Sequence, residues 1–175
     1  MKVISYILIM LLAMGAVQTI ADEHMRAVDP AAELQDAALN YESAAKAHMT
    51  LANNLLHSRR DAPADEDPQN QRNRRIQNAG QELQAAEQLM HAAANFDHAE
   101  RTWRAAAQAT QEKNARDYFQ RAGRESRQRA TSLIRRAAAL AEHAALEYAA
   151  NDDLNNQSRA SHRAGRIREQ LAGRN

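Results

Sequence analysis

Alanine occupies most of the positions at which a helical protein usually places its large apolar side chains. Between residues 30 and 60, one row of positions advances in steps of three and four, the spacing of one helix face; its members are Leu34, Ala37, Ala38, Tyr41, Ala44, Ala45, His48, Leu51, Ala52 and Leu55. Residues 76–93 repeat this row, with alanine at every seventh position. Small side chains on two facing helices let their backbones lie close together. The sequence therefore predicts an all-α fold: an alanine-rich antiparallel helical hairpin or small helical bundle with coiled-coil-like packing.

The helix boundaries follow from capping and breaking residues. Asp29-Pro30 is a typical helix start, because Asp caps free N–H groups and Pro suits the first turn. Residues 61–70 contain two prolines and four acidic residues, a composition typical of a loop. This acidic loop is long enough for the flanking helices to run antiparallel. The expected helices are residues 30–60, 70–95, 97–150, which the polar residues 111–114 can interrupt, and 157–172.

The first 21 residues have the pattern of a secretory signal peptide. One lysine precedes an apolar run over residues 3–17, and the small residues Thr19 and Ala21 occupy positions −3 and −1 of a cleavage after Ala21. The run is shorter than the ~20 residues of a membrane-spanning helix, although a retained anchor is the alternative. We expect residues 22–175 to form a single exported domain, periplasmic or secreted, with no membrane span after cleavage. The chain contains no cysteine, which excludes disulfides, thiolate metal ligands and lipid attachment through cysteine.

Such a chain has little bulk with which to build a core. Hydrophobic residues make up 44% of the sequence, and 39 of them are alanines. A buried alanine contributes far less than a buried leucine, whereas ordering each residue still costs about 1–2 kcal/mol. We therefore expect stabilisation by self-association or by a protein partner. The contacts predicted to do this are the larger side chains Leu34, Tyr41, Leu55, Leu83, Phe96, Trp103 and Leu140.

Charge is distributed unevenly along the chain. Residues 22–69 carry ten acidic and four basic residues, whereas residues 70–136 carry seven acidic and thirteen basic residues. The basic part includes an arginine-rich stretch: Arg116, Arg121, Arg124, Arg127, Arg129, Arg135 and Arg136. These arginines either bind a polyanion or pair with the acidic first helix. The scarcity of aromatic residues for base stacking argues against nucleic acid.

Each methionine beyond the leader is adjacent to a histidine: Met25 to His24, Met49 to His48, and Met90 to His91. Adjacent residues on a helix diverge by about 100°, so neither helical pair can direct both side chains at one ion. A site between helices is still open, with His48, Met90, His91 and His98 as ligands, since imidazole with thioether suits copper. The alternative is that these side chains fill the alanine-lined interface.

No motif typical of catalysis is present. The sequence lacks H-E-x-x-H, G-x-S-x-G, a phosphate-binding loop and a paired-glycine fingerprint, and it lacks the Glu-x-x-His pairs of a di-iron bundle. The sequence therefore predicts a non-enzymatic protein without a cofactor, which acts as a binding or scaffold protein through helix-face contacts. The alternative function is a periplasmic metal-binding protein of the copper type.

Overall fold

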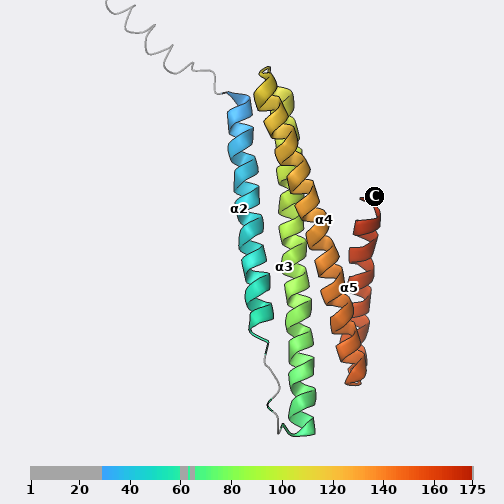
Figure 1. Cartoon of the computed structure of the whole chain (residues 1–175). Coiled ribbons are helices and arrows are strands. Elements are labelled where there is room, and N and C mark those ends of the chain that lie inside the picture. Colours follow the sequence, from blue (N-terminus) through green and yellow to red (C-terminus); the bar gives the residue numbers. More distant parts are fainter. Residues whose placement is uncertain (1–28, 60–62, 64–65, 175) are drawn as a thin grey trace, which may run out of the picture.

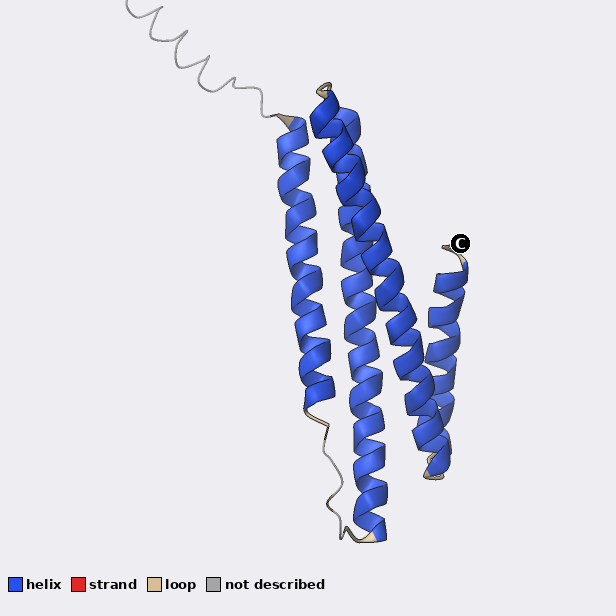
Figure 2. Cartoon of the chain, viewed as in Figure 1, coloured by secondary structure: helices blue, strands red, loops and turns tan. Residues whose placement is uncertain are grey.

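The protein is a bundle of long helices. The computed structural model describes residues 29–59, 63 and 66–174 (Figure 1). Within these residues the chain forms four helices and no strand: α2 (Pro30–His57), α3 (Pro68–Ala109), α4 (Lys113–Ala150) and α5 (Leu154–Ala172) (Figure 2). The predicted all-α small bundle is confirmed. The predicted leader, residues 1–21, lies outside the described residues, and none of the described helices is long and apolar enough to cross a membrane.

The same two-residue signal starts both α2 and α3. The Asp29 carboxylate accepts from the Ala31 backbone N–H at 3.0 Å, with Pro30 in the first turn. Asp67 precedes Pro68 and accepts from the N–H groups of residues 69 and 70. The prediction of a loop through residue 70 is therefore wrong by three residues, because Asp67-Pro68 is a cap rather than a breaker.

The predicted boundary between residues 95 and 97 does not exist, since α3 continues to Ala109. Asn95 does not cap a new helix; its side-chain amide donates to the His91 carbonyl oxygen one turn earlier, at 3.1 Å. The apolar row shifts at this point because α3 is buried between two neighbours and packs on both α2 and α4. The corner lies at residues 110–112, which overlaps the possible break expected at residues 111–114, and the Thr110 hydroxyl accepts there from the Glu112 N–H at 3.2 Å.

The last helix starts three residues before the predicted residue 157. Asp153 caps it by accepting from the Asn156 N–H at 3.2 Å. The chain reverses into this cap through Asp152, whose φ of 55° lies in the left-handed region. Asp153 of this polar segment thus caps α5.

Alanine forms the interface between the helices, as its spacing predicted. Ala31, Ala38, Ala45 and Ala52 recur every seven residues on α2 and are at most 3% exposed. They face buried alanines of α3 and α4. The largest fully buried apolar side chains of the central cluster are Leu89, Phe96 and Ile134. In Figure 1, α2 and α5 lie to either side of the α3–α4 pair.

Candidate functional site: the groove between α2 and α4

A groove runs between α2 and α4. Both helices pack on α3, but they make only local contact with each other, so that α3 forms the floor between them. Two cavities, of about 260 and 420 Å³, lie along this line. Together their lining residues define the α2–α4 groove: Leu39, Glu42, Lys46 and Met49 from α2, Phe96 and Trp103 from α3, and Tyr118, Arg121, Ala122, Glu125, Arg129, Ser132 and Leu133 from α4.

The floor and one edge of this groove are apolar. Phe96 and Trp103 are each 1% exposed and form the floor. Leu39 and Tyr118, at 44% and 47% exposed, are two of the six exposed large apolar side chains of the described residues. Tyr118 meets Trp103 edge to face, with ring centroids 5.9 Å apart. An exposed apolar patch joined to a buried aromatic floor is typical of an interaction surface.

Glu42 fixes the floor to both walls. Its Oε1 atom accepts from Trp103 Nε1 at 3.0 Å and from Ser126 Oγ at 2.8 Å. Trp103 and Ser126 are both buried, on α3 and α4 respectively. One carboxylate of α2 therefore ties three helices together at the base of the groove, and it holds the single tryptophan of the chain in place.

Arg129 lies between the two cavities and lines both. Its guanidinium is 3.8 Å from Glu42 and 3.9 Å from Glu125, and it stands 5.8 Å above the centre of the Phe96 ring. These separations are long for ion pairs, and the side chain is half exposed. Its charge is therefore still accessible to a ligand in the groove.

The rim carries three cations, Lys46, Arg121 and Arg129, against one exposed carboxylate, Glu125. Lys46 and Arg121 line it from opposite walls, and no ion pair of either is seen among the described residues. Beyond the second cavity, Arg136 Nη2 donates to Asn53 Oδ1 at 3.1 Å and joins α4 to α2. Glu42 keeps its negative charge at the base of the groove, so the charged lining residues are three cations and two carboxylates, and the groove has a small net positive charge.

The residues predicted to contact a partner occupy three different environments. Phe96 and Trp103 form the floor of the α2–α4 groove. Leu34, Leu55, Leu83 and Leu140 are partly buried against the core clusters. Tyr41 is exposed, and its ring stacks on that of His98 with centroids 5.2 Å apart. Most of these side chains thus pack inside the bundle.

The arginines predicted to bind a polyanion point in several directions around α4. Arg121 and Arg129 line the groove, and Arg124 lines a separate cavity of about 300 Å³ with Glu100 and Arg104. Three others donate to oxygens of the chain: Arg116 to Thr110, Arg127 to Arg174 and Arg136 to Asn53. Arg135 is exposed. The structure does not bring the seven together into one patch.

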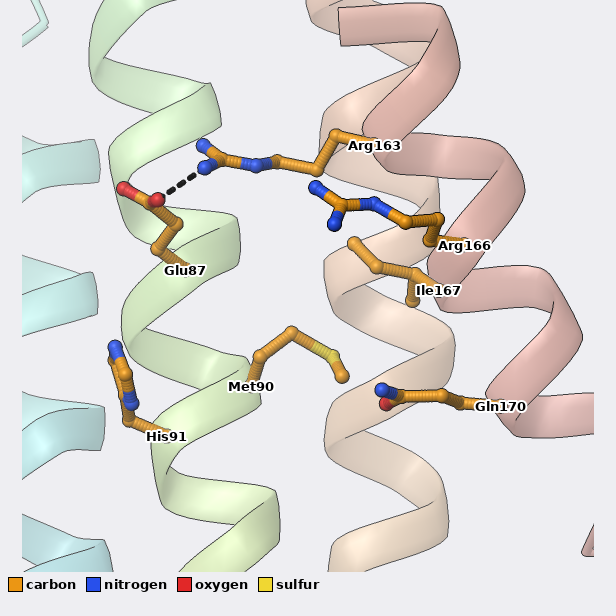
Figure 3. A pocket seen from close by; sticks show the side chains of 7 residues that line it. All are labelled: Glu87, Met90, His91, Arg163, Arg166, Ile167 and Gln170. Carbon is orange, nitrogen blue, oxygen red and sulfur yellow. Dashed lines mark ion pairs between the residues drawn. The ribbon is translucent and has the colours of Figure 1, made fainter.

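The four predicted metal ligands are divided between two sides of α3. His48 and His91 face each other across the α2–α3 interface, with ring centroids 5.4 Å apart. His98 lies two turns along α3 and stacks on Tyr41. Figure 3 shows Met90 reaching toward Ile167 and Gln170 of α5, while His91 lies on the side of α3 nearer to α2. No group of three or more His, Asp or Glu side chains able to hold a metal occurs within the described residues.

Figure 3 also shows the side chains that line a cavity between α3 and α5. The volume of this cavity is about 230 Å³. Met90 and Ile167 form its apolar part, and the ion pair between Glu87 and Arg163 crosses it. Glu87 stands four residues before His91, the spacing of a helical chelate. Because Glu87 is paired with α5, it is directed away from the histidine pair.

Most of the groove escaped prediction from the sequence. Leu39, Glu42, Lys46 and Met49 form a row at steps of three and four, directly beside the alanine row of α2. That spacing was a usable signal, but the row mixes charges with apolar residues and resembles a solvated face. Its role depends on where α4 lies, which the sequence of α2 does not contain.

Comparisons with protein-family models, with curated proteins and with solved structures gave no match to this chain.

Proposed function

We propose that the protein is an exported, non-enzymatic binding protein, and that its α2–α4 groove takes an amphipathic helix with acidic flanks from a protein partner. The observation that carries this proposal is an apolar floor with a positively charged rim. A helix lying between α2 and α4 would pack on the exposed Leu39 and Tyr118 above the buried floor and place its flanks beside Lys46 and Arg121. Helix-in-groove recognition combines these two features.

The dimensions of the groove fit this occupant. Ten residues of α2 separate Leu39 from Met49, which corresponds to about 15 Å along the helix axis at ~1.5 Å per residue. This length accommodates about three turns of a partner helix. Each of the two cavities then receives an apolar side chain, and Arg129 between them meets an acidic one.

Trp103 permits a direct test, because it is the only tryptophan and lies in the floor. Two tryptophan-free synthetic peptides would share one apolar helix face and carry either glutamate or lysine on its flanks. We expect the glutamate peptide to change Trp103 emission saturably and the lysine peptide to have little effect. Equal responses, or no response to the glutamate peptide, would contradict the proposal.

Charge reversal sharpens the test. Lys46→Glu/Arg121→Glu should invert the preference toward the lysine peptide. The matched control is Arg101→Glu/Arg135→Glu, which reverses two exposed cations that do not line the groove cavities and gives the same net charge. If the control variant inverts the peptide preference equally, the glutamate peptide is attracted by the net charge of the whole protein rather than by the groove. If the protein forms a dimer that Leu39→Asp dissociates, the occupant of the groove is a second copy of this chain. That result would overturn the proposal of a different protein as partner.

Export is the second part of the proposal, and it depends on the leader pattern of residues 1–21. N-terminal sequencing of protein recovered from outside the cytoplasm should begin at Asp22. Recovery of the full-length chain in the membrane fraction would instead indicate a retained anchor.

A further inference from the structure

Two ring pairs form a ladder across the α2–α3 interface. Tyr41 stacks on His98, and one heptad further along, His48 packs against His91. Seven residues forward on α2 correspond to seven residues backward on α3, which is the register of an antiparallel coiled coil. This interface lies on the flank of α2 that faces α3, away from the α2–α4 groove, so its properties are independent of the proposed function.

His48 is held in a defined orientation. Its Nδ1 atom lies 2.8 Å from Gln88 Oε1, and Gln88 precedes His91 by three residues on α3. Because the Gln88 oxygen only accepts, Nδ1 donates in this contact, which leaves Nε2 as the nitrogen that can bind a metal through its lone pair. A histidine whose second ring nitrogen donates to an oxygen is the usual arrangement of a metal ligand, since that bond fixes the tautomer and the ring.

His91 supplies a second imidazole at a suitable distance. Metal–nitrogen bonds of about 2.0–2.1 Å place each ring centre about 3 Å from an ion, so that two rings at tetrahedral or wider angles lie roughly 5–6 Å apart. The observed separation of 5.4 Å falls within this range. His91 is exposed, so an ion and its remaining water ligands have access.

We propose that His48 and His91 form a two-imidazole site for a divalent transition-metal ion, with water completing the coordination. The structure excludes both neighbouring thioethers: Met90 faces α5, and Met49 lines the α2–α4 groove. Without thioether ligands the site favours Cu²⁺ over Cu⁺, and Cu²⁺ binds imidazole more tightly than Ni²⁺ or Zn²⁺ does. The bound ion joins α2 to α3.

The test is a Cu²⁺ titration of the exported chain, followed by electron paramagnetic resonance and by thermal melting. All variants carry His24→Ala, because a histidine third from a free amino terminus at Asp22 would itself bind Cu²⁺. We expect one site with two imidazole nitrogens, and a melting temperature that rises with Cu²⁺ because the ion binds the folded state.

The variants distinguish this site from general histidine binding. His48→Asn or His91→Asn should weaken Cu²⁺ binding at least tenfold. Gln88→Met, which keeps both rings, should weaken it by about 10–100-fold, the usual effect of removing a partner that orients a ligand. The matched control is His98→Asn, which removes the equivalent ring one heptad away and should leave binding unchanged.

Helical circular dichroism establishes that each variant folds; His91 and His98 are both exposed, so their replacement leaves the core intact. Two results would overturn the site: equal weakening by His98→Asn, or undiminished binding by His91→Asn. A melting temperature that does not respond to Cu²⁺ would exclude an ion joining the two helices.

Discussion

Two carboxylates join α3 and α4 to α2, or to the residues that directly follow it, at different levels, and they are held by different kinds of partner. Glu42 accepts from the Trp103 indole and the Ser126 hydroxyl, which are neutral and buried. Glu82, itself 1% exposed, contacts Arg59 at 2.9 Å and His143 at 2.6 Å. Along α3, Glu82 and Trp103 are about 30 Å apart.

The difference lies in what solvent can reach. The two hydrogen-bond donors to Glu42 cannot ionise and are shielded from salt, and its one ionic contact, with Arg129, is long at 3.8 Å, so this junction should hold over a wide range of conditions. The side chains of Arg59 and His143 are 40% and 52% exposed, whereas that of Glu82 is 2% exposed. A buried carboxylate whose partners are exposed is stable while the ion pairs are formed. When the ion pairs break, the unpaired buried charge lowers the free energy of unfolding. The Glu82 end is therefore the conditional end of the bundle.

The largest expected effect follows from removing both partners of Glu82. Arg59→Ala/His143→Ala leaves a buried carboxylate unpaired, and we expect a loss of about 3 kcal/mol in the free energy of unfolding, the lower end of the range for broken buried pairs. Urea denaturation followed by circular dichroism measures this loss. Adding Glu82→Gln to the double variant should restore much of it, because the buried charge is gone. A double variant as stable as the parent would show that Glu82 is not effectively buried.

A smaller effect is expected at the Glu42 end. Glu42→Met keeps the side-chain length and removes the acceptor, which leaves the buried Trp103 N–H unsatisfied at a cost of about 1–3 kcal/mol. Ser126 keeps the Ala122 carbonyl oxygen as an acceptor at 3.0 Å. Glu42→Gln is the matched control, since an amide oxygen can accept in the same place. Equal losses in both variants would show that the charge of Glu42, rather than its acceptor, holds the junction.

The two ends should also differ at alkaline pH. Burial raises the pKa of Tyr148 above its ordinary value of 10.0, and the carboxylates of Asp153 and Glu82 raise it further. Above pH 10 the unfolded chain releases this proton while the folded chain retains it. The unfolded state then binds fewer protons, so the free energy of unfolding falls as pH rises toward the folded pKa.

Tyr148→Phe should remove that part of the alkaline loss, and Glu82→Gln should reduce it, as measured by urea denaturation at about pH 9 and about pH 11. The quantity to compare is the difference between parent and variant at each pH, because other groups titrate in this range. If the free energy of unfolding fell equally between the two pH values in the parent and in Tyr148→Phe, the ionisation of Tyr148 would not contribute to the alkaline loss of stability.

The sequence allowed the alanine interface to be predicted because it is periodic. Ala31, Ala38, Ala45 and Ala52 are buried as their spacing required, and Asp29-Pro30 marked the start of α2. The identical signal at Asp67-Pro68 was interpreted as a loop because acidic residues surround it. The capping signal was thus present at both Asp-Pro pairs. At Asp67-Pro68 the acidic composition of the surrounding residues outweighed it in the prediction.

The contacts between helices were less accessible to sequence reasoning. The His48–His91 and Glu42–Trp103 contacts depend on the register of α2 against α3, and the length of the connection between the helices does not determine that register. Glu82 resembles an ordinary surface glutamate in a polar stretch, and only the placement of Arg59 and His143 reveals its burial. Residues 95–97 misled for a related reason: a helix with two neighbours shifts its apolar row without ending.

The smallest expected effects come from Gly→Ala substitutions at three glycines within helices. Their effects on stability report how tightly the helices pack around each glycine. Alanine is favoured over glycine in a helix by about 1 kcal/mol, provided that its Cβ fits. At Gly165 nothing lies within 4 Å of an added Cβ, so Gly165→Ala should gain the full amount. At Gly80, near Glu82, the Cβ would lie 3.4 Å from the Tyr148 hydroxyl oxygen, the end of a side chain that can move.

At Gly123, near the Glu42 junction, the Cβ would lie 3.4 Å from Trp103 Cβ and 3.5 Å from the Glu100 carbonyl oxygen. Both separations are ordinary van der Waals contacts, but these atoms belong to the backbone of α3 or are attached directly to it, so they leave the added Cβ no further room. We therefore expect the gain in the free energy of unfolding to decrease from Gly165→Ala to Gly80→Ala to Gly123→Ala, with the last the smallest. Chemical denaturation of the three variants measures the order. If Gly123→Ala gained as much as Gly165→Ala, α3 and α4 could separate at no cost beside Trp103, and the Glu42 end would not be the rigid one.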